Sequence, residues 1–271
     1  MITFVTHFVK LNDEEMINVN KVISHFYNGD VYHHKNPMRL IRIMFTSVKM
    51  YHPECKLVIL TDEDTCFDVD EDVTIVRSHR ATDQLNFERM KARHAFLETL
   101  SNDNHLIFLD WDILIQMNLE HLFDRGDDLV LTYRRKHSIP INDGFFGVHR
   151  NSINKFHHFL TDIFEYYDNL PHEDYRKWWG FQMILNELFS GYLPTISNPA
   201  SPFCFNFNGL QVALLRTDKY NASPKLLPLK SSFFPAVAVM HFKGVRKSMI
   251  TDYWNRLQEV YAESKKTNLQ T

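Results

Sequence analysis

The stretch HLIFLDWD, residues 105–112, runs from an apolar segment directly into two carboxylates. Its first five residues predict a buried β-strand, which is followed by Asp110, Trp111 and Asp112. In an extended chain, residues two apart face the same side, so we expect the two carboxylates to converge while Trp111 points away. Two like charges held together favour a divalent cation, and oxygen ligands suit Mg²⁺ or Mn²⁺. Solvated loop carboxylates give the same short pattern by chance, so the rest of the chain decides whether these two aspartates indicate a metal site.

Outward from this strand, apolar runs alternate with segments of helical periodicity. The expected strands cover residues 2–9, 56–61, 73–76, 105–109, 129–133, 144–149 and 236–241. The expected helices follow a capping box at Asn12 and Glu15, begin at Pro37, and cover residues 85–100, 152–167, 180–189 and 251–264. This alternation predicts an α/β fold with a mixed, mainly parallel sheet flanked by helices. Residues 194–202 are expected to form a loop, and without a repeat or linker we expect residues 1–271 to form one domain.

Composition excludes several classes of protein. The chain has only 8 Gly and contains neither GxGxxG nor a Walker-type GxxxxGK motif, so a nucleotide would be held by other means. A net charge of −3 with scattered signs argues against a nucleic-acid partner. The N-terminus does not resemble a signal peptide, no apolar run is long enough for a transmembrane segment, and the 3 Cys are far apart. We therefore expect a cytoplasmic protein, with peripheral contact to a membrane left open.

Several short motifs, scattered over most of the chain, accompany the carboxylate pair. They are Phe87-Glu88-Arg89-Met90, Asn142-Asp143-Gly144, Phe181-Gln182-Met183-Ile184-Leu185-Asn186 and His241-Phe242-Lys243-Gly244-Val245-Arg246-Lys247. Together with residues 106–112 they resemble the glycosyltransferases of the GT-A fold, most closely family 8 and its relatives. The resemblance implies metal-dependent transfer of a sugar from a nucleotide-diphosphate donor, a UDP-sugar in the first instance, to a glycan or another hydroxyl acceptor.

The resemblance also implies roles for individual residues. His241 would be the third metal ligand beside Asp110 and Asp112, and Lys247 would meet the donor diphosphate. A histidine at a strand end can coordinate a metal, and a lysine supplies a positive point charge. The resemblance places the remaining nucleotide-sugar contacts at Arg89, Trp111 and Gly244, where Gly244 allows a tight backbone turn.

Other assignments rest on position. Thr6 and His7 end the first expected strand, where such folds receive the nucleotide base. Asn206 and Asn208 resemble an aromatic-Asn element on the acceptor side, although a turn role is an equal alternative. Residues 175–179 combine positive charge with aromatic rings, which suits either a sugar acceptor or core packing.

At one place the chain departs from the family. Phe181 stands where the family has an aspartate before Gln182, so a carboxylate expected near the anomeric carbon is missing there. Asp143 could supply one instead, as a base or as partner to an acceptor hydroxyl, or it could simply stabilise a turn. We expect catalytic roles for Asn142, Asp143 and Gln182, and retention of anomeric configuration stays an open question.

Two other functions compete with this interpretation. A phosphatase of the haloacid-dehalogenase kind also carries a strand followed by two aspartates. However, it normally has the motif near the N-terminus and Thr or Val where this chain has Leu114. A non-catalytic GT-A module that binds a sugar nucleotide or glycan without turnover is the other alternative, because of Phe181.

Overall fold

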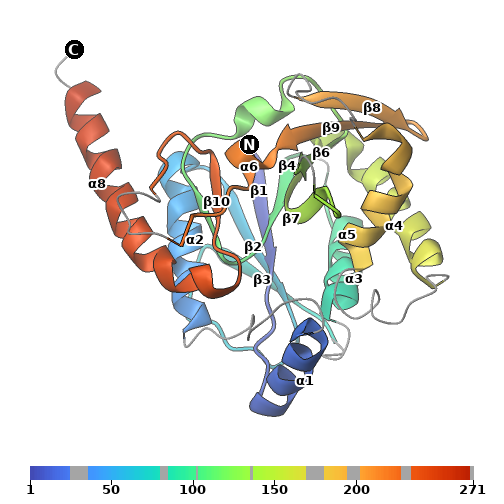
Figure 1. Ribbon diagram of the computed structural model, residues 1–271, viewed down its shortest axis with the longest axis horizontal. Coiled ribbons are helices and arrows are strands. Elements are labelled where there is room, and N and C mark those ends of the chain that lie inside the picture. The colour runs from blue at the N-terminus through green and yellow to red at the C-terminus, as the bar shows by residue number, and fades with distance from the viewer. Residues whose placement is uncertain are drawn as a thin grey trace.

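A central eight-stranded sheet organises the computed structural model, which describes residues 1–24, 36–79, 85–101, 103–134, 137–168, 180–193, 202–226 and 233–268 (Figure 1). In spatial order the strands are β3 (Val73–Arg77), β2 (Lys56–Thr61), β1 (Ile2–His7), β4 (His105–Leu109), β7 (Ile141–Val148), β6 (Leu129–Tyr133), β9 (Leu210–Arg216) and β8 (Phe203–Phe207). Strands β7 and β8 run opposite to the other six. The predicted mixed, mainly parallel sheet is therefore confirmed.

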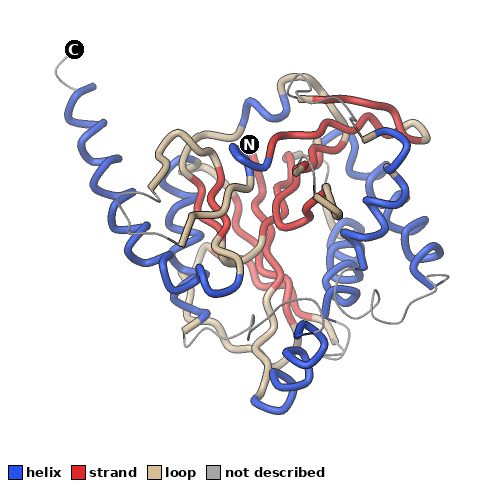
Figure 2. Tube along the Cα trace, viewed as in Figure 1, coloured by secondary structure: helices blue, strands red, loops and turns tan. Residues whose placement is uncertain are grey.

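Helices cover both faces of this sheet (Figures 1 and 2). One side carries α2 (Pro37–Tyr51) and α8 (Ile250–Asn268), and the other carries α3 (Leu85–Glu98), α4 (Ile153–Asp168) and α5 (Gly180–Leu188). The remaining described helices are α1 (Asp13–Ser24), the one-turn α6 (Thr217–Tyr220), and the 3₁₀ segments η2 (Glu120–Phe123), η3 (Arg150–Ser152), η5 (Ser190–Tyr192) and η6 (Gly244–Met249). None of the helices in the described ranges is long and apolar enough to cross a bilayer.

Local sequence accounts for where two of the helices begin. Before α1, the Glu15 amide donates to Asn12 Oδ1 at 2.9 Å, and the Asn12 amide donates to Glu15 Oε2 at 2.8 Å. These reciprocal bonds are the predicted capping box, which satisfies donors that have no partner inside the helix. At α2, Asn36 Oδ1 accepts from the Arg39 amide at 3.0 Å, and Pro37 occupies the first turn, where its missing N–H costs nothing.

Strand β4 shows why the sheet needs helices on both faces. Leu106 and Phe108 pack into the core beneath α3, α4 and α5, whereas Ile107 and Leu109 pack into the core beneath α2. All four side chains are at most 1% exposed. Burying each contributes about 1.5–3 kcal/mol relative to exposure, so a strand without polar alternation is stable only between two layers.

A second, two-stranded sheet extends the fold beyond the end of β4. It pairs β5 (Ile113–Ile115) with the antiparallel β10 (Val239–His241), so that His241 lies opposite Ile113. Helix α2 packs against it, and Ser47 Oγ accepts from the Ile115 amide at 3.1 Å. This sheet brings a late segment of the chain beside the residues that follow β4.

The sequence-based boundaries need several corrections. Strand β1 ends at His7 rather than residue 9, β7 begins at Ile141 rather than residue 144, and the strand expected at 236–241 covers only Val239–His241, outside the central sheet. The hairpin of β8 and β9 was not predicted, although Asn208-Gly209 at its turn is a strong hairpin signal, with φ of 48° and 85°. The expected loop at 194–202 lies outside the described residues except for Pro202, and residues 175–179 lie wholly outside them.

Candidate functional site

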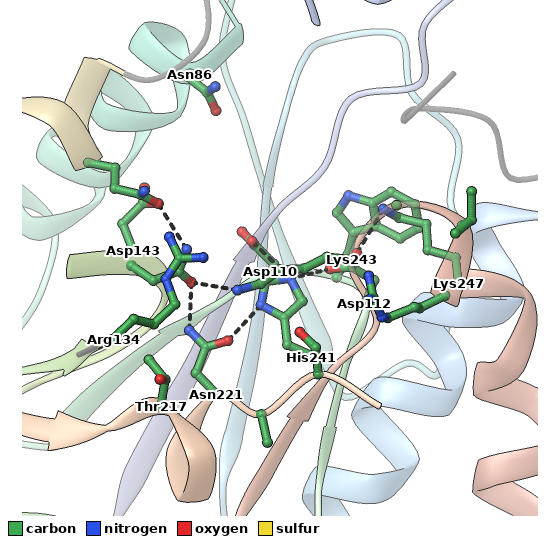
Figure 3. Close-up of a pocket in the computed structure, with 18 of the residues that line it drawn as sticks. Asn86, Asp110, Asp112, Arg134, Asp143, Thr217, Asn221, His241, Lys243 and Lys247 are labelled. Atoms are coloured by element: carbon green, nitrogen blue, oxygen red, sulfur yellow. Dashed lines mark hydrogen bonds and ion pairs between the residues drawn. The ribbon is translucent and has the colours of Figure 1, made fainter. Parts of the chain in front are cut away.

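Asp110, Asp112 and His241 meet where β4 ends and the small sheet begins (Figure 3). His241 Nε2 lies 3.1 Å from Asp112 Oδ1 and 3.4 Å from Asp110 Oδ2. One ligand atom from each of the three side chains can be chosen so that all lie within 4.8 Å of one another. Asp112 and His241 are buried, and the Asp110 carboxylate is 25% exposed. Two carboxylates and an imidazole that face one point form a donor set suited to Mn²⁺ or Mg²⁺ with positions left for other ligands.

The carboxylates converge by a different route from the one expected. Residues 110–112 form a turn between β4 and β5 rather than an extended continuation of β4. The Asp110 amide donates to Gly144 O at 2.8 Å, and Asp112 O accepts from the Phe242 amide at 2.9 Å. The turn is therefore fixed by backbone bonds to β7 on one side and to the end of β10 on the other.

The charges of this cluster fit a metal-binding state. Burial by itself would raise the pKa of Asp112, but Lys247, whose Nζ lies 2.8 Å from Oδ2, and His241 outweigh it and hold the pKa well below its usual range. Burial lowers the pKa of His241, against the opposing effect of Asp112. An ionised carboxylate beside a neutral imidazole is the combination that coordinates a metal ion.

A chain of hydrogen bonds fixes which nitrogen of His241 faces the carboxylates. Lys243 Nζ can only donate, and it lies 3.2 Å from Asn142 Oδ1. That oxygen also accepts from Asn221 Nδ2 at 2.6 Å, so the remaining Asn221 Oδ1, 2.8 Å from His241 Nδ1, must accept. Nδ1 therefore carries the proton and Nε2 presents its lone pair to Asp110 and Asp112, as in metal sites whose histidines are oriented by a second partner.

Gly144 allows β7 to approach this cluster. The pairing of β6 with β7 shifts between Leu131 and Thr132, which leaves residues 143–145 of β7 without partners on β6. A Cβ atom at Gly144 would lie 2.5 Å from His241 Cε1 and 2.7 Å from Asp110 Oδ2. Any other residue here would displace His241 or Asp110, because contacts below 3.0 Å force neighbouring groups to move.

Arg89 connects the carboxylate cluster to β7. Its two terminal nitrogens lie 2.8 Å from Asp110 Oδ1 and 2.6 Å from Asp143 Oδ2, so one guanidinium spans two carboxylates. Arg93, one turn further along α3, lies 3.9 Å from the same Asp143 oxygen and packs against Phe146. Burial lowers the pKa of Arg93 to about 9, with Arg89 adding to the effect, so Arg93 is charged at neutral pH.

The carboxylate cluster, Arg89 and Asp143 line one cavity of about 900 Å³, within the upper range of small-molecule sites. The predicted residues on its walls are His7, Arg89, Asp110, Trp111, Asp112, Asn142, Asp143, Gln182, His241, Gly244 and Lys247. Thr6 is buried in β1 and does not line the cavity. Asn206 and Asn208 belong to the β8–β9 hairpin and its turn and do not line it either; Asn206 Oδ1 accepts from the Gly209 amide at 3.0 Å.

The segment after β10 brings Lys247 to the cavity wall, next to Asp112. Gly244 has a φ of 58° and begins η6, which returns Lys247 to Asp112. The Lys247 ammonium also lies 5.1 Å from the centre of the Trp111 ring, and that ring meets Phe8 edge-on at 5.4 Å. Trp111 is therefore part of the cavity wall rather than pointing away from it.

Phe181 and Gln182, at the start of α5, have different surroundings. Phe181 is 1% exposed and packs against Phe146 in the core, although it also lines the cavity. Gln182 Oε1 accepts from Asn142 Nδ2 at 2.9 Å. Its Nε2 is buried without a hydrogen-bond partner among the described residues, which is a costly arrangement for a donor.

Residues at the site that were missed from the sequence include Arg93, Arg134, Asn221 and Lys243. Lys243 lies inside the quoted motif, and Arg93 follows Arg89 by one helical turn, so both had a local signal. Asn221 follows the one-turn α6, and its role depends on contacts with β6 and β7 far along the chain. Burial, followed by Arg134, lowers the pKa of Lys243 to about 8.

The sequence matches no protein-family model and no curated protein. Among solved structures, the apo form of the glycosyltransferase GlyE from Streptococcus pneumoniae TIGR4 is similar over 97% of this chain and 63% of its own, with 14% identity and a TM-score of 0.50. The galactosyltransferase LgtC, solved with donor and acceptor sugar analogues, is 13% identical over 94% of this chain and 95% of its own, with a TM-score of 0.48. A glycosyltransferase involved in glycosylation of the major capsid of PBCV-1 is 13% identical over 94% and 98%, with a TM-score of 0.49. The chain has the GT-A type of fold.

Proposed function

We propose that this chain, acting as one domain, transfers a sugar from a nucleotide-diphosphate donor to a hydroxyl acceptor with the help of a divalent metal ion. The observation that carries the proposal is the convergence of Asp110, Asp112 and the Nε2 lone pair of His241 at the wall of a cavity of about 900 Å³, in a chain with the GT-A fold. A ligand site is expected beyond the carboxyl ends of the strands in such a sheet. The cavity holds that position beside β1 and β4.

Asp110, Asp112 and His241 would hold Mn²⁺ or Mg²⁺, which would act as a Lewis acid toward the departing diphosphate. Transfer breaks the bond between the anomeric carbon and the diphosphate and forms a bond to the acceptor oxygen, whose proton is released. Negative charge therefore grows on the diphosphate. Lys247 and Lys243 line the cavity close to the carboxylate cluster, and fixed positive groups there would stabilise that charge without rearranging.

The donor assignment is a UDP-sugar. His7 and Phe8 line the cavity at the end of β1, where the nucleotide base would bind, while Thr6 would act only by supporting His7. The donor sugar would then lie toward β7 and α5, near Asn142, Asp143 and Gln182. The buried Gln182 Nε2 supports this placement, because a sugar oxygen would give that donor the partner it otherwise lacks.

Asp143 is the carboxylate proposed to act beside the sugar, since Phe181 is a core residue. Its Oδ2 is held by Arg89, so its position is fixed relative to Asp110 by a single guanidinium. This rigid placement supports a role in orienting the donor sugar or the acceptor hydroxyl. A glycan is the acceptor class that the proposal favours.

The test is a screen of nucleotide sugars with Mn²⁺, with Mg²⁺ and with chelator, which measures nucleoside diphosphate release and product formation. We expect turnover of one UDP-sugar, abolished by chelator and by Asp112→Asn. The matched control, Asp162→Asn, removes an exposed carboxylate on α4 and should retain turnover. Metal-independent turnover, or full activity of Asp112→Asn, would contradict the metal assignment.

The same assay separates the alternatives. Saturable binding of a UDP-sugar, with no diphosphate release over a broad acceptor panel, would show a non-catalytic binding module rather than an enzyme. Phosphate release from model esters, without any need for a sugar nucleotide, would instead support a phosphatase.

A further inference from the structure

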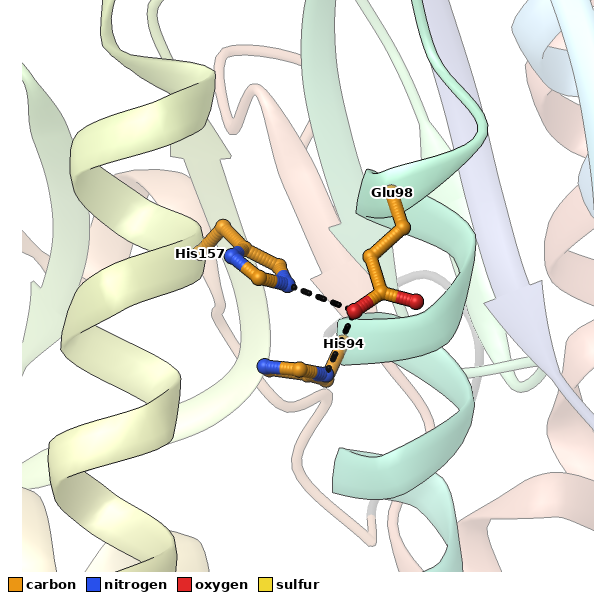
Figure 4. Close-up of side chains that lie close together, drawn as sticks. All are labelled: His94, Glu98 and His157. Carbon is orange, nitrogen blue, oxygen red and sulfur yellow. Dashed lines mark ion pairs between the residues drawn. The ribbon is translucent and has the colours of Figure 1, made fainter.

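A second group of potential metal ligands lies between α3 and α4, apart from the cavity (Figure 4). His94 and Glu98 are one turn apart on α3, and His157 faces them from α4. His157 Nε2 lies 3.3 Å from Glu98 Oε1, and His94 Nδ1 lies 4.0 Å from the same oxygen. The two imidazole rings are 3.9 Å apart between centres, so all three side chains point toward one small volume.

Thr161 orients the imidazole of His94. Its Oγ1 lies 3.0 Å from His94 Nε2 and 3.3 Å from His157 O, so this hydroxyl contacts both histidines. Because Nε2 is engaged by Thr161, Nδ1 is the nitrogen of His94 that faces the Glu98 carboxylate. In the tautomer with its proton on Nε2, Nδ1 offers a lone pair to a cation bound between the two side chains.

The second imidazole of the group supplies another nitrogen without a hydrogen bond. His157 Nε2 is a buried atom with no hydrogen-bond partner among the described residues, and it lies 3.3 Å from Glu98 Oε1. Two imidazole nitrogens and one carboxylate oxygen thus lie within 4.8 Å of one another, a spacing that one metal ion can bridge.

We propose that His94, Glu98 and His157 bind a Zn²⁺-type ion that ties α3 to α4. Two imidazoles and one carboxylate are a familiar zinc ligand set, and a water molecule would complete the tetrahedron. Zinc bonds of about 2.0–2.1 Å place tetrahedral ligands about 3.3–3.4 Å apart. The His157–Glu98 distance already has this value, and the His94–Glu98 distance exceeds it by an amount that a rotation of the 59%-exposed Glu98 side chain can close.

The position of the site gives it a structural role. Helix α3 carries Arg89 and Arg93, which hold Asp143 and Asp110 on the cavity side. An ion that joins α3 to α4 would restrain the helix from which these arginines project. Thr161 would act as the outer partner that orients His94.

The test is titration of the chelator-treated chain with Zn²⁺ in competition with a chromophoric zinc chelator. We expect His94→Gln and His157→Gln each to bind one equivalent of Zn²⁺ less than the wild-type chain. The matched control is His158→Gln, the same change at the exposed next residue of α4, which should bind as the wild type does. Thr161→Val should keep the stoichiometry but weaken binding about 10–100-fold.

Thermal unfolding supplies a second measurement, since an ion that binds only the folded state raises its midpoint. The zinc-dependent increase should be smaller in His157→Gln than in His158→Gln. Mn²⁺ binding at the cavity should be equal in His157→Gln and His158→Gln, which shows that each variant is folded. If His157→Gln misfolds, Glu98→Gln replaces it, because Glu98 is exposed and its removal disturbs the fold less. Equal Zn²⁺ stoichiometry in wild type, His157→Gln and His158→Gln would overturn the proposal.

Discussion

His241 Nδ1 lies 2.8 Å from Asn221 Oδ1, and this contact determines which face of the imidazole meets the carboxylates. Asn221 in turn donates from Nδ2 to Asn142 Oδ1 and to Thr132 Oγ1, so its amide cannot rotate without losing both bonds. The metal-facing lone pair of His241 thus depends on a residue that contacts neither carboxylate in the described structure.

Asn221→Ala should therefore weaken Mn²⁺ binding about 10–100-fold, the range seen when an outer partner of a metal ligand is removed. Titration calorimetry with Mn²⁺ measures the effect. Asn118→Ala is the matched control, because Asn118 is exposed and its side chain accepts from the nearby Glu120 amide. Unchanged Mn²⁺ affinity in Asn221→Ala would contradict the assigned tautomer.

Gly144→Ala should destabilise the chain by about 1–3 kcal/mol, because the added methyl group overlaps the His241 ring and the Asp110 carboxylate. Urea unfolding measures the loss, and Mn²⁺ affinity should fall in parallel as the ligands separate. At Gly191 an added Cβ meets nothing within 4 Å, so Gly191→Ala should leave both quantities unchanged. A Gly144→Ala chain as stable as Gly191→Ala would show that β7 can move away.

Arg89→Lys should lower kcat/KM on the order of 100-fold, because one ammonium cannot span Asp110 and Asp143 as a guanidinium does. Donor-dependent diphosphate release gives the measurement once a donor is known. Arg256→Lys, at an exposed pair with Glu259 on α8, is the control and should have no effect. Activity near the wild-type level in Arg89→Lys would show that the reaction does not need a guanidinium that bridges Asp110 and Asp143.

His52 should make the stability depend on pH between about 6.5 and 4. Its Nε2 accepts from the Leu119 amide at 3.1 Å, and burial lowers its pKa from 6.5 to about 4, despite Glu120. In this window the unfolded chain binds the proton and the folded chain does not. Stability from this group is therefore complete above pH 6.5 and is lost as the pH falls toward 4.

Urea unfolding at pH 7 and pH 5.5 tests this expectation. The loss of stability between the two pH values should be smaller in His52→Gln than in the wild type, by at most about 1 kcal/mol. Glutamine can still accept a hydrogen bond but does not titrate. His105, whose pKa burial also lowers to about 4, retains its own contribution in both proteins and so cancels in the comparison.

The parts of the fold that sequence predicts are those with a local cause. Asn12 and Glu15 are three residues apart, so their capping box is visible without a structure. Residues 106–109 of strand β4 are all apolar because both faces of the strand are covered, and the sequence of the strand alone shows this. The order of β4 in the sheet, between β1 and β7, follows from packing and not from any one segment.

The site was predictable to the extent that its residues cluster in short motifs. Asp110, Asp112, His241 and Lys247 lie in two such motifs, and they meet in space. Asn221 does not lie in either, and its partners Thr132 and Asn142 are 89 and 79 residues away. The turn at residues 110–112 was expected to be extended, because nothing in the local sequence reveals that β5 pairs with β10.

That pairing has a consequence for the order of folding. Gln116, just after β5, donates to Val237 O at 2.8 Å across a separation of 121 residues, and His241 reaches Asp112 only when this contact region has closed. Contacts so distant along the chain form late, because a long loop must lose its freedom before any of them stabilises the protein. Metal affinity therefore depends on this long-range closure, because His241 is not beside Asp112 without it. A partly folded chain in which β5 and β10 have not paired would lack its third metal ligand, and so would not bind the ion as the folded chain does.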